Sequence, residues 1–318
     1  MKYSVISSFL GKSKDRFNEY NEPRTLEEKF AIASTIEGIS ALECVYPYEV
    51  NDPKETKALM EKYHLGISAI NVNVKAEPEF LNGGLTNADK KVRDKAVRFI
   101  KQAKDFAAEI GADKVTCCPL GDGYEFAFQA DYAENWNRLK ETFSNAAAYK
   151  PEIMLFIEFK PSEIRGKCFL DTTAKTILLI KEIGRKGIGV TMDYGHAIYG
   201  GCNPAEEISL CHSCGIPYYV HINDNDAKWD WDYFCGSKHI VENLEFVYYL
   251  KKYGYNDYLT SDTSPTRWDM VKVFKTNNRF TDKMDRIVKT MEADGFENVI
   301  TGKNFMDVWE FVENHLVK

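Results

Sequence analysis

Four short apolar runs in the second half of the chain each end in a side chain that can bind a metal ion. The runs are IMLFIE, IGVTMD, PYYVH and DYLTSD, and their last residues are Glu158, Asp193, His221 and Asp262. Parallel strands of a sheet or barrel bring their carboxyl ends together at one edge, so these side chains are expected to meet there. Three carboxylates and one imidazole suit Mg²⁺, Mn²⁺ or Co²⁺, whereas structural zinc sites more often use thiolates.

Three further ligand-type side chains lie between these strand ends. His196 follows a tight turn predicted at Gly195 in DYGH, and Asp230 and Asp232 lie in the loop KWDWD. Carboxylates one residue apart, with an imidazole nearby, can hold a second hard cation. Two adjacent ions would polarise a carbonyl and stabilise the neighbouring alkoxide. The alternative for the two aspartates is a solvated acidic loop.

Lys160 lies two residues after Glu158 in IEFKPSEIRG. Side chains two residues apart on a strand share a face, so one can bind a metal while the other contacts a substrate oxygen. The alternative is a lysine that pairs with a carboxylate at the surface. A lysine pointing into a barrel mouth has little other reason to be buried, which favours the substrate contact.

A repeated β/α unit accounts for the rest of the chain. The predicted strands cover residues 3–8, 41–45, 67–72, 114–118, 153–158, 188–193, 218–222 and 258–262. The predicted helices cover residues 26–37, 53–64, 88–110, 132–149, 172–183, 204–214, 241–253 and 267–294, with an extra terminal helix over 305–317. Such alternation implies parallel strands with right-handed crossovers. We therefore expect an α/β fold, a (β/α)8 TIM barrel, as a single domain over residues 1–318.

The composition excludes several classes of protein. A net charge of -7 argues against nucleic-acid binding, which requires a basic face, and favours a small polar substrate. No apolar run approaches the roughly 20 residues of a membrane helix, and the N-terminal residues lack the features of a signal peptide. Eight scattered cysteines in a long chain indicate reduced thiols. We expect a cytoplasmic protein without membrane or nucleic-acid partners.

The motifs of residues 150–265 resemble those of xylose isomerase. EFKPSEIRG is similar to its glutamate-x-lysine-proline segment, DYGH to its carboxylate-x-glycine-histidine turn, KWDWD to its aspartate-x-aspartate loop and SDTSP to its aspartate-x-x-proline strand end. The first half of the chain resembles that family only in its β/α rhythm. The resemblance implies an enzyme of the xylose isomerase-like TIM barrel superfamily that interconverts an aldose and a ketose by a metal-assisted 1,2-hydride shift.

The same resemblance implies roles for the residues singled out above. One ion would be held by the four strand-end residues, and a second by Asp193 together with His196 and the two loop aspartates. Catalysis would involve Glu158, Lys160 and Asp262, and substrate binding Lys160 and His196. The implied cofactor is Mn²⁺ or Mg²⁺, with Co²⁺ as a third candidate, as one or two ions. The implied assembly is a homodimer or homotetramer.

This sequence departs from xylose isomerase itself in two respects. His221 replaces a carboxylate, which makes the site more like those of rhamnose isomerases and of the sugar epimerases on this barrel. A counterpart of the ring-opening histidine is not evident, and the third strand finishes at Asn71 and Asn73, which could handle ring opening. A pentose, or a branched sugar such as apiose that opens easily, would fit this difference.

Three other functions remain open. A ketose 3-epimerase would use Glu158 and Asp262 to remove and return a proton through an enediolate. The short side chain of Asp262 and the extra carboxylates Asp230 and Asp232 favour the isomerase. An abasic-site endonuclease on the same barrel would need a basic DNA-binding face, and a catalytically silent binding protein would not need a complete ligand set.

Overall fold

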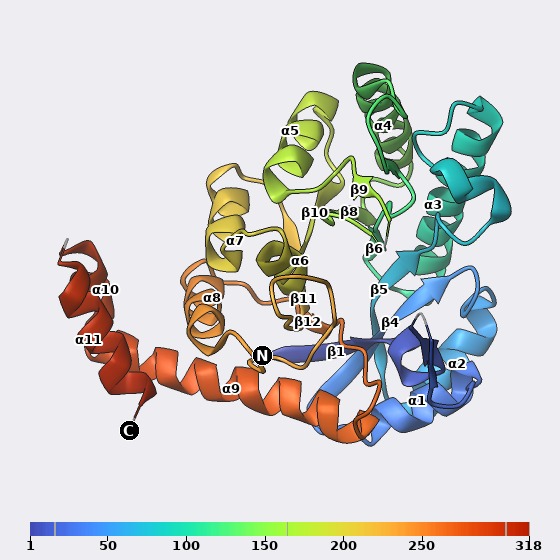
Figure 1. The fold of residues 1–318 in the computed structure, drawn as a ribbon. Coiled ribbons are helices and arrows are strands. Elements are labelled where there is room, and N and C mark those ends of the chain that lie inside the picture. Colours follow the sequence, from blue (N-terminus) through green and yellow to red (C-terminus); the bar gives the residue numbers. More distant parts are fainter. Residues whose placement is uncertain (16, 164, 303, 318) are drawn as a thin grey trace.

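Eight parallel strands close into a barrel in the computed structural model, which describes residues 1–15, 17–163, 165–302 and 304–317 (Figure 1). Around the barrel the order is β1 (Lys2–Ile6), β12 (Tyr258–Ser261), β11 (Tyr218–Ile222), β10 (Ile188–Asp193), β8 (Met154–Glu158), β6 (Lys114–Cys117), β5 (Gly66–Val72) and β4 (Ile39–Tyr46). Each predicted strand is present, with its bounds shifted by no more than two residues. The predicted (β/α)8 barrel is confirmed.

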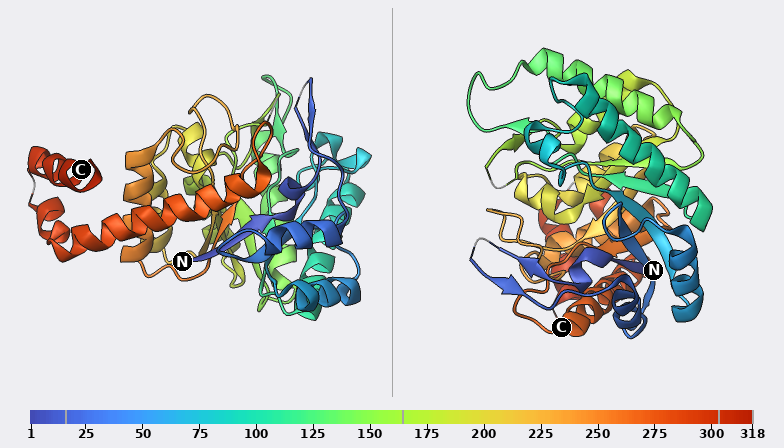
Figure 2. Two further views of the ribbon diagram at one scale, coloured as in Figure 1. Left: turned by 90° about the horizontal axis from the view of Figure 1, so that it is seen from below. Right: turned by 90° about the vertical axis from the view of Figure 1, so that its right-hand side faces the viewer.

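The helices that follow the strands surround the barrel (Figures 1 and 2). They are α1 (Leu26–Ser34), α2 (Pro53–Tyr63), α3 (Lys90–Ile110), α4 (Tyr132–Ala148), α5 (Thr173–Ile183), α7 (Pro204–Ser213), α8 (Ile240–Lys252) and α9 (Met270–Ala293). Their ends follow local signals. Thr25 and Glu28 form a capping box at the start of α1, and Gly111 ends α3 with φ +83°, a conformation that glycine adopts without strain.

Several short elements were not predicted. They are α6 (Tyr194–Tyr199), α10 (Phe296–Thr301), the 3-10 helices η1 (Ser7–Leu10) and η2 (Pro78–Asn82), and two small sheets, β2 (Ser13–Lys14) with β3 (Glu19–Tyr20) and β7 (Gly123–Tyr124) with β9 (Lys167–Cys168). All are too short to produce a periodic apolar pattern. Most of them lie in the loops between strands and helices.

The extra terminal helix is confirmed as α11 (Phe305–Leu316). The long helix α9 extends past the barrel, and α10 and α11 lie at its far end, beside α8 (Figures 1 and 2). Phe296, Tyr248 and Val288 form part of a second, smaller apolar cluster that joins these helices. Within the described ranges, no helix combines the length and apolar character that crossing a bilayer requires.

An apolar layer fills the barrel interior below its carboxyl end. Because side chains alternate along a strand, Phe156 and Tyr219 share the inward face of β8 and β11 with Glu158 and His221. Their rings lie 5.9 Å apart between centroids and pack with Ala69 of β5. This layer supports the polar side chains at the strand ends.

Candidate metal centre

The four strand-end residues converge at the carboxyl end of the barrel. Each offers one ligand atom, and these atoms lie within 4.8 Å of one another in the set Glu158, Asp193, His221 and Asp262. His221 Nδ1 lies 3.4 Å from both Glu158 Oε1 and Asp262 Oδ2, and 3.9 Å from Asp193 Oδ2. Ligands about 2.1 Å from one ion lie roughly 3.0–3.5 Å apart, so a single divalent cation fits between these atoms.

Two buried atoms of this set support the same interpretation. Glu158 Oε1 and His221 Nδ1 have no hydrogen-bond partner among the described residues. Leaving a buried polar atom without a partner costs roughly 1–3 kcal/mol, so such atoms in a native site indicate a missing partner. The two atoms face each other, and a metal ion would satisfy both.

Asp193 connects the metal centre to the short helix α6. Its Oδ1 accepts a hydrogen bond of 2.7 Å from the backbone N–H of His196 and thereby caps α6. The tight turn predicted at Gly195 is therefore wrong, because this cap starts a helix there. A side chain at Gly195 would place its Cβ 2.4 Å from Asn223 Oδ1, so the close approach of the two segments requires glycine.

His196, Lys160 and Asp230 form a second polar cluster beside the first. Asp230 Oδ2 lies 3.1 Å from His196 Nε2 and 2.9 Å from Lys160 Nζ, which also lies 2.9 Å from Glu163 Oε2. His196 Nδ1 lies 2.8 Å from the carbonyl oxygen of Phe159, so it donates there and directs Nε2 toward Asp230. The side chains of Lys160 and Asp230 are only 12% and 4% exposed, and Asp230 Oδ1 lacks a hydrogen-bond partner among the described residues.

The predicted second ligand set is gathered less completely than the first. His196 Nδ1 lies 3.9 Å from Asp193 Oδ1, but it points to a backbone carbonyl. Lys160 already provides a positive charge at Asp230. Among the described residues, the acidic and histidine side chains that are spaced closely enough to hold a metal ion are those of the first set. A second ion remains a prediction.

The electrostatics of the cluster show an excess of negative charge. Burial raises the pKa of Asp193 to about 7, and the charges of Asp262 and Asp230 add to the rise although His196 opposes it. Burial, followed by the charge of Asp230, also holds the pKa of Asp232 well above its usual range. Neighbouring buried carboxyl groups oppose each other's ionisation, and a cation bound between them stabilises their ionised forms.

The histidines partly balance this charge. Burial alone would raise the pKa of Glu158, but the neighbouring His221 lowers it to about 2. Burial likewise opposes the charged form of His196, yet Asp193 and Asp230 raise its pKa to about 10. The metal-free centre therefore holds protons that a bound divalent ion would displace.

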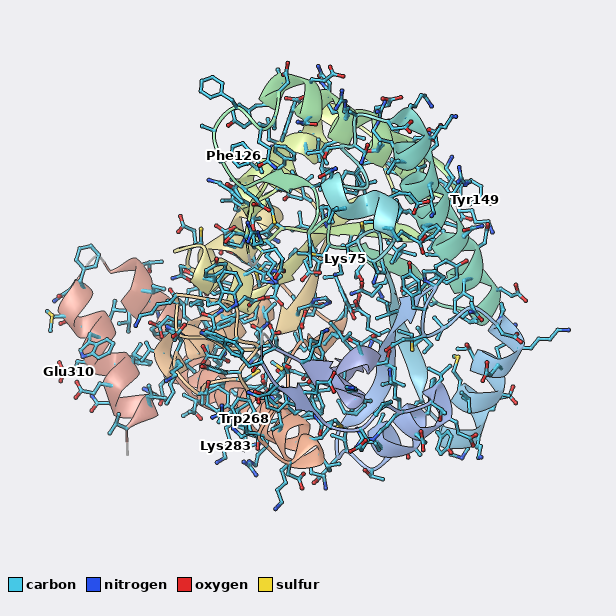
Figure 3. The ribbon with its side chains drawn as sticks, turned by 45° about the vertical axis from the view of Figure 1, so that its right-hand side comes forward. Lys75, Phe126, Tyr149, Trp268, Lys283 and Glu310 are labelled. Atoms are coloured by element: carbon cyan, nitrogen blue, oxygen red, sulfur yellow. The ribbon has the colours of Figure 1, made fainter. Side chains whose placement is uncertain are left out.

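A cavity of about 320 Å³ opens above both clusters. From the predicted site it is lined by Glu158, Lys160, His196, Asp230, Asp232 and Asp262. The opposite wall comes from the first half of the chain and contains Ile6, Ser8, Phe9, Val45, Asn71, Asn73, Lys75, Cys118 and Leu120. Lys75, labelled in Figure 3, lies just beyond β5. The volume is at the small end of the range for small-molecule sites.

The sequence did not point to Glu43, which is buried in β4 and contacts the metal centre. Its Oε2 lies 3.0 Å from His221 Nε2. The available signal was a single carboxylate inside the apolar strand ALECVY, because a buried charge requires a partner. The predicted roles of Asn71 and Asn73 in ring opening remain predictions; Asn71 donates a hydrogen bond of 2.9 Å to Glu43 Oε1.

Curated relatives include the xylose isomerase of Thermus thermophilus. It is 24% identical over 205 residues, which cover 63% of this chain and 53% of that protein. The chain thus spans about half the length of the curated relatives that it matches.

Solved structures share the fold at low sequence identity. A structure of L-ribulose 3-epimerase has a TM-score of 0.70 and 20% identity, and the match covers 92% of this chain and 97% of that one. The structure of the IOLI protein with a bound zinc atom has a TM-score of 0.68 and 14% identity, covering 90% and 98%. The family model described as xylose isomerase-like TIM barrel matches residues 30–300. The chain therefore belongs to the xylose isomerase-like TIM barrel family.

Proposed function

We propose that the protein is a divalent-metal-dependent aldose–ketose isomerase acting on a small sugar by a 1,2-hydride shift. One observation carries the proposal: the buried Lys160–Asp230–His196 cluster borders the same cavity as the metal ligands Glu158 and Asp262. A bound Mn²⁺ or Mg²⁺ ion would polarise the substrate carbonyl and stabilise negative charge on the oxygens of the two adjacent carbon atoms between which the hydride moves.

The protein's own groups would position the substrate beside that ion. Lys160 can donate a hydrogen bond to the oxygen that gains negative charge, and Asp230 and Glu163 orient its ammonium group. The carbonyl oxygen of Phe159 accepts from His196 Nδ1, and Asp230 contacts its Nε2, so a substrate hydroxyl or a second ion would have to compete with Asp230 for Nε2. The cavity of about 320 Å³ supports a pentose or a branched sugar such as apiose.

A ketose 3-epimerase is the second candidate. Of the four metal ligands, Glu158 and Asp262 line the cavity, and each lies 3.4 Å from His221 Nδ1. Two carboxylates that flank a bound ketose could remove and return a proton at one carbon. The structural similarity to L-ribulose 3-epimerase is consistent with this reaction.

The test is to incubate the Mn²⁺-loaded protein in deuterated water with pentoses, deoxyhexoses, apiose and the corresponding ketoses. Hydride transfer moves hydrogen within the substrate, so we expect an aldose to give its ketose with little deuterium at the reacting carbons. Proton abstraction exchanges with solvent. A ketose that is inverted at carbon 3 with one deuterium incorporated, without conversion of any aldose, would establish the epimerase instead.

A further inference from the structure

His221 presents its two ring nitrogens to different surroundings. Nδ1 faces Glu158 Oε1 and Asp262 Oδ2, both at 3.4 Å, without a hydrogen bond. Nε2 lies 3.0 Å from Glu43 Oε2, and the side chains of His221 and Glu43 are both fully buried. A nitrogen that binds a metal carries no proton, whereas a nitrogen that donates to a carboxylate carries one. With an ion bound at Nδ1, the two surroundings would therefore select the tautomer that carries its proton on Nε2.

Glu43 is itself held in place through its second oxygen. Oε1 accepts hydrogen bonds of 2.7 Å from Thr116 Oγ1 and 2.9 Å from Asn71 Nδ2. These donors come from β6 and β5, on one side of Glu43, and His221 comes from β11 on the other. The carboxylate thus joins β4 to β11 through the barrel interior, and its own rotation is restricted by donors on three strands.

We propose that Glu43 is a positioning residue of the metal centre. It keeps the proton of His221 on Nε2, leaves Nδ1 free to bind the ion and fixes the plane of the ring. Carboxylates that accept from a metal-bound imidazole orient the ring and strengthen it as a ligand. The inference rests on the metal centre of the proposed function but does not depend on which sugar reaction the centre supports.

Glu43→Gln distinguishes positioning from simple filling of a buried space. The substitution keeps the size of the side chain, and its carbonyl oxygen can still accept from Thr116 and Asn71. Its amide nitrogen would then face His221 Nε2 and donate to it. Such a donor moves the ring proton to Nδ1, the nitrogen that faces the metal ligands.

The experiment measures Mn²⁺ binding by calorimetry on metal-stripped protein and the imidazole ¹⁵N shifts of the Mg²⁺-loaded protein. We expect Glu43→Gln to weaken Mn²⁺ binding by roughly 10–100-fold. The His221 signals should show a protonated Nε2 in the unchanged protein and a protonated Nδ1 in the variant. Neither readout requires enzymatic activity.

Glu49→Gln is the matched control. Glu49 follows β4 and accepts from Ser7, Lys29 and the backbone N–H of Val45, none of which belongs to the metal centre. This variant should lower the unfolding temperature and leave Mn²⁺ affinity unchanged. If Glu43→Gln fails to fold, Thr116→Val removes one of the donors that orient Glu43 and should also weaken Mn²⁺ binding.

The outcomes separate the two proposals. If the unchanged protein does not bind Mn²⁺, the metal centre itself is wrong, and the role of Glu43 is wrong with it. If the unchanged protein binds Mn²⁺ and Glu43→Gln, or Thr116→Val in its place, binds it equally well, the positioning role is overturned while the metal centre stands.

Discussion

Asp230 holds the second polar cluster together at the scale of single residues. Its Oδ2 contacts both His196 and Lys160, while its Oδ1 has no hydrogen-bond partner among the described residues. One carboxylate therefore orients an imidazole and an ammonium toward the same cavity. This geometry supports the proposal that Lys160 contacts the substrate while the four strand-end residues hold the primary ion.

Lys160→Met tests that division of roles. The variant removes the ammonium group but leaves all four strand-end ligands, so we expect kcat to fall by roughly 100-fold while Mn²⁺ affinity changes little. Lys167→Met, which removes an exposed lysine paired with Asp171, should leave both quantities unchanged. Steady-state kinetics and calorimetry measure the two quantities. A large loss of Mn²⁺ affinity in Lys160→Met would instead mean that Lys160 contributes to binding of the ion and not only to contact with the substrate.

Glu158→Gln and Asp262→Asn test the primary ligands. Each replaces a carboxylate by an amide of equal size, so the fold is kept while a charged ligand is lost. We expect an inactive protein with near-native circular dichroism and weakened Mn²⁺ binding, because neutral amides are poorer ligands of hard cations. Near-normal turnover by either variant would remove that residue from the catalytic assignment.

The site residues that could be predicted are the polar side chains that end a run of apolar residues in a predicted strand. Asp193 and His221 lie at the carboxyl ends of apolar strands, and strand ends in a barrel share one rim. Glu43 lies inside its strand, and its function depends on His221, which is far away in the sequence. Periodicity contains no information about such a long-range partner.

At the scale of elements, helix periodicity predicted α3 but did not reveal its buried lysine. Lys104 lies between Ile100 and Ala107 on the buried face of α3 and is itself fully buried. Its ammonium donates a hydrogen bond of 2.8 Å to the carbonyl oxygen of Tyr149, just after α4. The contact between α3 and α4 therefore contains a charge where the pattern suggested apolar packing. Likewise, α6 was missed because the Asp193 side chain, rather than a periodic pattern, starts it.

Lys104 makes the stability of this helix pair depend on pH. Burial lowers its pKa from 10.5 to about 8, so the folded chain binds fewer protons than the unfolded chain between these values. The free energy of unfolding should therefore rise with pH across this window. The cost of burying the charged ammonium of Lys104 is fully present below pH 8. Lys104→Met should stabilise the fold by about 1–2 kcal/mol at pH 7, and less at pH 10.

Urea unfolding at several pH values measures this difference. Lys91→Met is the control, because that lysine is exposed near the start of the same helix. A stability difference for Lys104→Met that stayed constant across the pH window would contradict the assigned cause.

At the scale of the whole molecule, the candidate metal ligands and the opposite wall of the cavity come from different halves of the barrel. The ligands come from β8, β10, β11 and the end of β12, which are consecutive neighbours around the barrel. The opposite wall of the cavity comes from residues 6–120. The motifs of the second half predicted the metal chemistry, but Phe9, Val45 and Lys75 belong to no motif. The identity of the sugar could not be predicted for that reason.

Because one ion would join four neighbouring strands, metal removal should destabilise the whole barrel. Mn²⁺ at about 100 times its Kd would stabilise the folded chain by about 2.7 kcal/mol and raise the unfolding temperature by roughly 5 °C. Thermal scans with Mn²⁺ and with a chelator measure this shift. His221 Nδ1 lies within 3.9 Å of a carboxylate oxygen of each of the other three ligands. In His221→Asn, which loses this nitrogen, the shift should largely disappear. Equal unfolding temperatures with Mn²⁺ and with the chelator would mean that the ion does not bind between these strands.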